Sequence, residues 1–222
     1  MTSPLRYRAV LFDLDGTLVD SYAALADAIN HVRRTHGLTD LPESSIRGFV
    51  GHGIETLLSS AFDTNEVPDG VQAAFEQRYD EICCEQSYLL DDVEATISAL
   101  DDLGIAMAVC TNKPTSFSRK ILEFLQLAPY FRAIVGPDLA GARKPAAQHL
   151  LITLASTECT ERDALFVGDM PVDVEAARNS GIDVAVVASG SSSAHDLRAA
   201  RPDHYLDHFS DLLHIVRHGV TA

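Results

Sequence analysis

Two aspartates near the start of the chain follow an apolar run at a spacing of two residues. Asp13 and Asp15 come directly after residues 10–12, Val-Leu-Phe, which are typical of a buried strand. Carboxylates this close repel each other unless a cation or a shared proton offsets their charge. The pair therefore predicts a metal site or acid–base chemistry.

Three further polar segments occupy comparable places later in the chain. They are Thr111-Asn112-Lys113, Lys144-Pro145 and Asp169 with Asp173 four residues on. Hydroxyl and amide groups can hydrogen-bond a phosphoryl group, and a lysine can balance the charge of its oxygens or of a nucleophile. Taken singly, an aspartate after a strand often forms a turn or caps a helix. Four such segments in order at predicted strand ends favour a catalytic site.

The chemistry that these residues allow is phosphoryl transfer through a covalent intermediate. Asp13 can attack phosphorus, and Asp15 can protonate the leaving oxygen and then deprotonate the attacking water. Asp169 would complete the oxygen ligands of a Mg²⁺, which reduces the repulsion between an anionic nucleophile and an anionic phosphoryl group. Asp173 would orient metal-bound water or Lys144. A role in capping the following helix remains open for Asp169 and Asp173.

Apolar runs and helical spacings predict the elements that position these residues. Strands are expected at residues 9–12, 105–110, 133–135, 164–167 and 184–187, with helices at 93–103, 114–125, 146–155, 172–179 and 211–216. This alternation predicts a parallel sheet with helices on both faces and right-handed crossovers. Ligands of such sheets bind outside the carboxyl ends of the strands. Asp13, Thr111 and Asp169 each follow a separate predicted strand.

Residues 19–88 have a different pattern. Helices are expected at 22–36, 54–62 and 71–84, with Ser21 as the N-cap of the first and turns at 51–53 and 68–70. We therefore expect a Rossmann-like α/β core, residues 1–18 and 89–222, and a small helical cap domain, residues 19–88, inserted after the first strand. Residues 189–193, Ser-Gly-Ser-Ser-Ser, are expected to form a flexible loop.

Composition and charge limit the classes of protein and partner. The chain has 222 residues, of which 46% are apolar, and a net charge of −15, which argues against sequence-independent binding of nucleic acid. No apolar run approaches the ~20 residues of a membrane span, and the first residues lack the layout of a signal peptide. We expect a cytoplasmic protein without a membrane partner, either a monomer or a homodimer. The four cysteines form no CxxC pair, so neither a zinc site nor a redox motif is indicated.

The four segments together resemble the motifs of the haloacid dehalogenase-like hydrolase superfamily, and the resemblance covers nearly the whole chain. It implies that Asp13 is the nucleophile, that Asp15 is the acid–base residue and that Thr111 binds phosphate. The same resemblance implies a Mg²⁺ held by Asp13, Asp169 and the backbone carbonyl of Asp15. It also implies that Lys144 is the catalytic lysine of the third motif and that Asp173 is the companion of Asp169 in the fourth motif. Because the dehalogenases of this superfamily lack an aspartate at the position of Asp15, hydrolysis of a phosphate ester is the implied reaction.

Within that superfamily the chain is similar to the phosphoglycolate phosphatase group. The similarity lies in residues 49–54, 111–114 and 200–204, whereas residues 89–93, residues 144–147 and Met170 depart from the pattern of the group. The glycines of the Gly51-His52-Gly53 turn permit close approach of the backbone, so His52 could reach a substrate carboxylate or phosphate. The alternative is that this turn only joins two helices. The expected substrate contacts are Thr17, Arg47, Gly51, His52, Gly53 and Asn112.

The sequence therefore predicts a Mg²⁺-dependent phosphatase that acts on a small, phosphoglycolate-like metabolite. A phosphosugar mutase or a pyrophosphatase would use the same groups, and the catalytic motifs do not exclude either. A non-catalytic binding protein is disfavoured, because Asp13, Asp15, Lys144 and Asp169 are all present.

Overall fold

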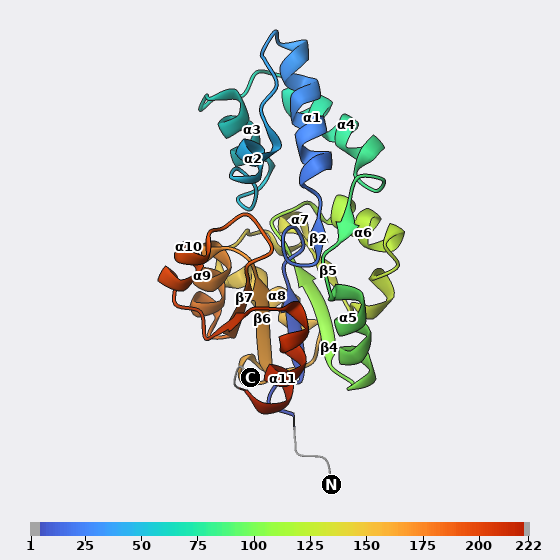
Figure 1. Ribbon diagram of the computed structural model, residues 1–222, viewed down its shortest axis with the longest axis vertical. Coiled ribbons are helices and arrows are strands. Elements are labelled where there is room, and N and C mark those ends of the chain that lie inside the picture. Colours follow the sequence, from blue (N-terminus) through green and yellow to red (C-terminus); the bar gives the residue numbers. More distant parts are fainter. Residues whose placement is uncertain (1–4, 220–222) are drawn as a thin grey trace.

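A six-stranded sheet forms the lower part of the molecule as drawn in Figure 1. The computed structural model describes residues 5–219. The strand order is β5-β4-β1-β6-β7-β8, and every neighbouring pair is parallel. The strands are β1 Ala9–Phe12, β4 Ala106–Cys110, β5 Ile134–Val135, β6 Ala164–Gly168, β7 Asp183–Val187 and β8 His204–Leu206. The expected parallel α/β core is confirmed, and β1 lies between β4 and β6.

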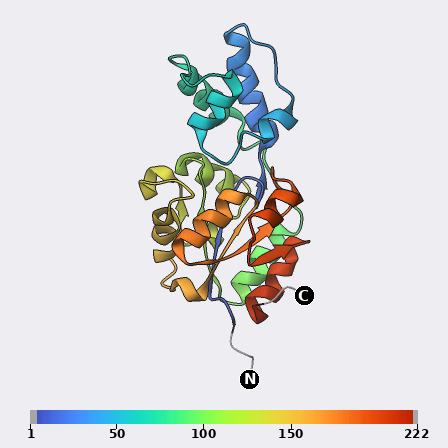
Figure 2. The ribbon, with the colours of Figure 1, turned by 90° about the vertical axis from the view of Figure 1, so that its left-hand side faces the viewer.

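Helices cover both faces of this sheet (Figure 2). They are α5 Val93–Asp102, α6 Thr115–Phe124, α7 Pro137–Ala140, α8 Ala147–Ala155, α9 Pro171–Ser180, α10 Ala194–Ala199 and α11 Leu212–His218, with short 3₁₀ turns at Ala128–Tyr130, Glu161–Asp163 and Phe209–Asp211. Because strand side chains alternate between faces, Val10 and Phe12 pack in one apolar cluster with α5, α6 and α11. Ala9 and Leu11 pack in the other with α8, α9 and α10. Burial on both faces explains why these strands are continuously apolar.

Four helices form a second group above the carboxyl end of β1 (Figure 1). They are α1 Tyr22–Thr35, α2 Glu43–Arg47, α3 Ile54–Phe62 and α4 Val71–Ile82. The chain enters and leaves this group through β2 Val19–Asp20 and β3 Tyr88–Leu89, which pair antiparallel. Helix α1 packs against the other three, and α3 also packs against α4. The pairing of β2 with β3 therefore places the helical group directly over the strand ends.

Several elements differ from the sequence-based expectation. Strand β8 and helices α2, α7 and α10 were not predicted, because they are short and largely exposed or half-buried. Ser21 stands at the N-cap position of α1, but its hydroxyl donates to Asp15 instead of capping the helix. Residues 189–193 were expected to be flexible, yet Ser189 Oγ donates to the carbonyl of Gly16 over 2.8 Å. This loop is thus tied to the strand ends.

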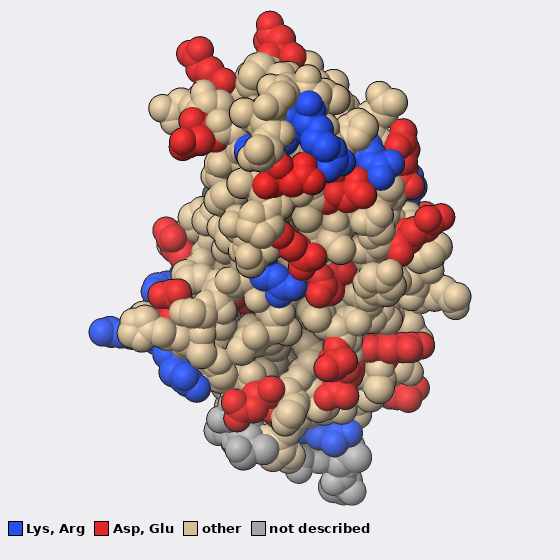
Figure 3. Space-filling model, turned by 45° about the horizontal axis from the view of Figure 1, so that its top comes forward, with Lys and Arg blue, Asp and Glu red and all other residues tan. Residues whose placement is uncertain are grey.

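Acidic side chains are spread over the face of the molecule shown in Figure 3, and basic ones are fewer. This distribution agrees with the net charge of −15. Within residues 5–219, no helix combines the length and the apolar character needed to cross a membrane. Cys83, Cys84, Cys110 and Cys159 are all free.

Candidate active site

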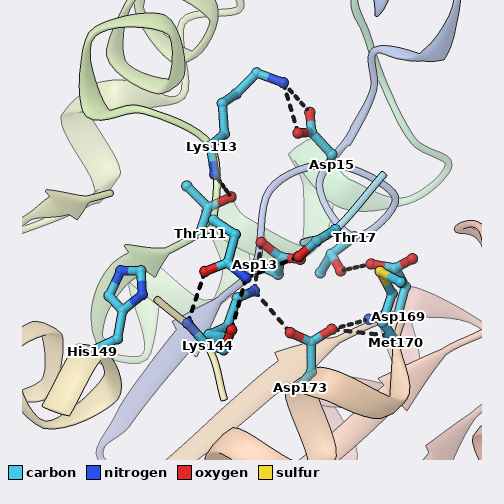
Figure 4. Close-up of polar contacts among 12 residues, drawn as sticks. Asp13, Asp15, Thr17, Thr111, Lys113, Lys144, His149, Asp169, Met170 and Asp173 are labelled. Carbon is cyan, nitrogen blue, oxygen red and sulfur yellow. Dashed lines mark hydrogen bonds and ion pairs between the residues drawn. The ribbon is translucent and has the colours of Figure 1, made fainter. Parts of the chain in front are cut away.

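The carboxyl ends of three neighbouring strands bring Asp13, Thr111 and Asp169 together (Figure 4). Each residue follows its strand directly, Asp13 after β1, Thr111 after β4 and Asp169 after β6. Because these strands are parallel and adjacent, their ends meet at one edge of the sheet. All three side chains are buried. The expected convergence of polar groups is therefore present in the structure.

Lys144 connects this group to α9. Its Nζ lies 2.9 Å from Asp13 Oδ1 and 2.8 Å from Asp173 Oδ1. Burial by itself would lower the pKa of Lys144, but the carboxylates of Asp13 and Asp173 outweigh that effect and raise it. The ammonium group is thus held in its charged form beside Asp13.

Carboxylate oxygens of Asp13, Asp169 and Asp173 all lie within 4.8 Å of one another. Burial, and next the charges of Asp173 and Asp13, raise the pKa of Asp169 well above its ordinary range. Burial is also the main cause that raises the pKa of Asp13 to about 6, against the opposing charge of Lys144. Asp13 Oδ1 is buried and, apart from the ion pair with Lys144, receives no hydrogen bond from the described residues. An all-oxygen donor set with excess negative charge fits a hard divalent cation such as Mg²⁺.

Asp173 is fully engaged by groups of the protein. Its Oδ1 accepts from Lys144, and its Oδ2 accepts from the backbone N–H groups of Asp169 and Met170 over 3.1 and 2.9 Å. The second set of bonds caps the N-terminus of α9. Asp173 therefore combines the two roles that the sequence left open, since it caps the helix and also holds Lys144.

Asp169 is oriented by a loop that sequence reasoning assigned no role. Thr17 Oγ1 donates to Asp169 Oδ1, and the backbone N–H of Ser191 donates to Oδ2, each over 3.1 Å. A Cβ atom at Gly190 would overlap the Asp169 carboxylate, so only glycine allows this approach. In the sequence, the one indication of this close contact was a glycine at position 190 within an otherwise serine-rich run. Thr17, one of the expected substrate contacts, binds this carboxylate in the structure.

Thr111 and Asn112 use their side chains differently. Thr111 Oγ1 accepts from the backbone N–H of Lys113, which leaves the hydroxyl proton free to donate to a ligand. Asn112 Oδ1 accepts from the backbone N–H of Lys144 over 2.8 Å. Its Nδ2 donates to the carbonyls of Lys144 and Gly51 over 3.1 and 2.9 Å. The Asn112 amide therefore joins the Lys144 segment to the helical group.

The Gly51-His52-Gly53 turn packs against loops of the sheet. A Cβ on Gly51, whose φ is 112°, would overlap the side chain of Met170. The His52 side chain is exposed and does not line the cavity next to Asp13. Arg143 holds the far side of the turn through an ion pair of 3.1 Å with Glu55. The structure thus places Gly51 and Gly53, but not the imidazole of His52, at the cavity wall.

Arg47 also points away from this cavity. Its guanidinium lies 3.6 Å from Asp20 and 3.8 Å from Glu43, and it stacks over the Tyr22 ring at 3.9 Å. Because it already has these partners outside the cavity lining, the structure does not bring Arg47 together with Asp13 and Thr111.

Lys113 is a site residue that the sequence did not single out. Its Nζ lies 2.9 Å from Asp15 Oδ1 and 2.7 Å from Oδ2, and both side chains are nearly buried. Burial alone would lower the pKa of Lys113, but the Asp15 carboxylate outweighs it and raises the pKa. Figure 4 shows this pair and the Lys144 pair on separate sides of Asp13. In the sequence, Lys113 was visible as the third polar residue of the Thr111-Asn112-Lys113 segment and as part of residues 111–114, but no role was assigned to it.

A small cavity of about 40 Å³ separates the strand ends from the helical group. Its apolar lining comes mainly from α1, α3, α4 and α6 and consists of Leu25, Val50, Ile54, Leu57, Phe75, Pro114 and Phe117. Its polar lining consists of Asp13, Asp15, Tyr79, Thr111, Asn112 and Lys113. The cavity therefore has a mostly apolar lining from the helices and a polar lining that includes Asp13 and Thr111.

Comparison with known proteins places this arrangement in a family. The family model described as haloacid dehalogenase-like hydrolase matches residues 10–187, which include all four polar segments. The chain belongs to the haloacid dehalogenase-like hydrolase family. A phosphoglycolate phosphatase of Photorhabdus laumondii is 30% identical over 212 residues, 93% of this chain and 91% of the relative. One of Caulobacter vibrioides is 35% identical over 187 residues, 82% of this chain and 79% of the relative.

Solved structures agree with this membership in the haloacid dehalogenase-like hydrolases. A predicted phosphoglycolate phosphatase from Haemophilus somnus has a TM-score of 0.87 at 27% identity, and the match covers 96% of this chain and 99% of that one. A predicted phosphatase from Clostridium acetobutylicum has a TM-score of 0.80 at 29% identity, with 93% and 96% covered. The expected superfamily, the similarity to the phosphoglycolate phosphatase group and the enzyme class, a phosphoric monoester hydrolase, are confirmed.

Proposed function

We propose that this chain is a Mg²⁺-dependent phosphatase that hydrolyses a small phosphorylated metabolite of the phosphoglycolate type through an aspartyl-phosphate intermediate. The observation that carries the proposal is that Asp13, Thr111 and Asp169 converge at adjacent strand ends, with Lys144 bound to Asp13, beside one compact cavity. The names of relatives that cover nine-tenths of the chain support the phosphoglycolate type of substrate.

Asp13 is the nucleophile of this proposal. One of its carboxylate oxygens attacks phosphorus, and the bond from phosphorus to the ester oxygen breaks. Asp15 gives its proton to that leaving oxygen. A water then attacks the phosphoryl group and returns a proton to Asp15, while the bond between phosphorus and Asp13 breaks. The sum is ester plus water giving alcohol plus phosphate, with both aspartates restored.

The other residues bind and orient the phosphoryl group. Thr111 donates its free hydroxyl proton, and Lys144 balances the charge on the phosphoryl oxygens and on Asp13. Asp13, Asp169 and the backbone carbonyl of Asp15 are the proposed Mg²⁺ ligands, and the ion would neutralise negative charge at the reacting group. Because both oxygens of Asp173 are already engaged, we assign it to orienting Lys144.

We also propose that residues 19–88 act as a cap domain over a core of residues 1–18 and 89–222. The first four and last three residues of that core lie outside the described part of the chain. The antiparallel β2–β3 pair and the shared lining of the cavity support this division. A cap that closes over the strand ends would exclude bulk water during phosphoryl transfer.

The test is phosphate release from p-nitrophenyl phosphate and from phosphoglycolate, with Mg²⁺ or with a chelator. Wild-type protein should require Mg²⁺, and Asp13→Asn should lose release by at least about 10³-fold. Full activity of Asp13→Asn would refute the nucleophile assignment. Isomerisation of a phosphosugar without net release would favour the mutase, and preferred cleavage of pyrophosphate would favour the pyrophosphatase.

A further inference from the structure

The cavity presents one cationic side chain to the part of a substrate that leaves. Among the described residues that line it, Lys113 is the sole cation, and it stands beside apolar side chains of the helical group. Lys144 lies deeper, against Asp13 and Asp173. Arg47 and Arg143 are paired with carboxylates outside the lining. Any anionic group on the leaving portion of a substrate therefore has Lys113 as its cationic partner.

Without a substrate, Lys113 is bound to the residue proposed to move protons. Its Nζ reaches both carboxylate oxygens of Asp15, and Ser21 Oγ donates to Oδ1 over 2.5 Å. The Asp15 carboxylate is thus held toward Lys113 and α1. A proton transfer to the leaving oxygen requires one Asp15 oxygen to face that atom at hydrogen-bond distance.

The ion pair opens only if another anion replaces Asp15. The Lys113 and Asp15 side chains are 6% and 11% exposed, so separating them without a substitute leaves a buried charge uncompensated, which is strongly unfavourable. Lys113 also lies 4.9 Å from the centre of the Tyr79 ring on α4, and this contact keeps its ammonium at the cavity wall. A carboxylate or a second phosphate on the leaving group could take the place of Asp15.

We propose that Lys113 selects phosphate esters whose leaving group is compact and carries its own anionic group. Binding such an ester exchanges the Lys113–Asp15 ion pair for a pair between Lys113 and the substrate anion, which frees Asp15 to turn toward the leaving oxygen. The exchange itself makes and breaks no covalent bond. Once it has left Lys113, the Asp15 carboxylate takes up one proton from solvent, and this is the proton that it gives to the leaving oxygen. A neutral leaving group offers no replacement, so Asp15 stays bound to Lys113. The inference rests on the proposed phosphatase function and adds the residue that determines its substrate class.

The test compares phosphoglycolate with ethyl phosphate, which has a leaving group of similar size without the carboxylate. Wild-type protein should prefer phosphoglycolate in kcat/KM by about tenfold to 100-fold, the worth of one charge-assisted hydrogen bond. In Lys113→Met the ratio should fall toward one, because phosphoglycolate turnover drops and ethyl phosphate turnover rises. Lys113→Arg should retain part of the preference. Pyrophosphate is the third substrate, and its preference over phosphoglycolate would identify the anionic group as a phosphate.

Two results would overturn the inference. One is a wild-type preference for ethyl phosphate, and the other is an unchanged ratio in Lys113→Met, including a parallel loss of both activities. Lys120→Met, in which an exposed lysine loses its pair with Asp80, is the matched control and should leave the ratio unchanged. If Lys113→Met does not fold, the inference is still tested by the wild-type preference for phosphoglycolate and by its partial retention in Lys113→Arg. Failure of the phosphatase proposal is recognised separately, because Asp13→Asn would then release phosphate from both esters.

Discussion

The two walls of the cavity hold their polar groups in opposite ways. On the sheet side, Asp13 and Asp169 are buried at strand ends with Lys144 beside Asp13, and these groups are bound to one another or to backbone groups. On the side of α1–α4, the cavity surface is mostly apolar, and Arg47 and His52 lie outside its lining. The difference teaches that reactive groups are placed on the rigid sheet, while the helical wall contributes shape.

The physical reason for this division is the cost of moving charge. A carboxylate or ammonium buried without its partner is strongly destabilising, so such groups are best carried by elements that keep their geometry. Apolar side chains carry no such penalty and can shift as helices move. The Asn112 amide, which bonds both to Lys144 and to Gly51, joins the two walls.

The largest loss of activity is expected from a substitution on the sheet side. Lys144→Met should lower phosphate release by at least about 10³-fold, because the charge beside Asp13 is lost. It should also lower the free energy of unfolding by about 3 to 5 kcal/mol, because Asp13 and Asp173 remain buried without their cation. Phosphate assays and urea unfolding measure both effects. Lys120→Met, in an exposed pair, should change stability by less than about 1 kcal/mol. Equal effects of the two variants would contradict the comparison.

Removal of the Asn112 hydrogen bonds that join the two walls should lower activity by an intermediate amount. Asn112→Ala removes the bonds to Lys144 and Gly51, so kcat/KM should fall by about tenfold to 100-fold through misplacement of Lys144. Asn112→Asp keeps the acceptor for the Lys144 N–H and should lose less. His52→Ala, on the exposed side of the same turn, should change kcat/KM by no more than about twofold. A larger loss in His52→Ala than in Asn112→Ala would show that the turn contacts substrate through its imidazole.

The helical wall should control the size of the substrate. Ile54→Ala removes a side chain that lines the cavity and should raise the preference for phospholactate, one methyl group larger, over phosphoglycolate by about tenfold. The measurement is the ratio of the two kcat/KM values. Leu38→Ala, at an exposed leucine of the helical group, is the control. The apolar wall has no role in selection if both variants keep the wild-type ratio.

A substitution of His149, which lies on α8 outside the cavity lining, should change turnover least. Its expected effect is on the pH dependence of stability. Burial is the main cause that lowers the pKa of His149 from 6.5 to about 4, and its Nδ1 has no partner among the described residues. Its contribution to stability is therefore complete above pH 6.5 and is lost as the pH falls toward 4. His149→Gln should reduce the loss of unfolding free energy between pH 7.5 and 4.5 by about 2 to 3 kcal/mol. Urea unfolding at both pH values measures this loss, and the exposed His195→Gln should reproduce the wild-type loss.

Prediction from sequence succeeded where a residue's place follows from its strand. Asp13, Thr111 and Asp169 were expected to meet because each follows a buried apolar run, and adjacent parallel strands bring their ends together. Strand β8 was not predicted because His204 and Tyr205 are half-buried on an edge strand and carry no apolar run. The contact of the loop at Gly190 with Asp169 was not predicted, because the composition of the loop does not reveal the carboxylate against which it packs.

The sequence by itself determined the family, most elements of the α/β core and the polar groups that meet at the sheet edge. These depend on local patterns, namely apolar runs, turn residues and four short polar segments. Only the tertiary structure decided which partner each side chain takes. Ser21 bonds to Asp15 instead of capping α1, Asn112 joins Lys144 to Gly51, and Lys113 pairs with Asp15. Such pairings join residues far apart along the chain, and their energies depend on burial, which spacing along a sequence does not record.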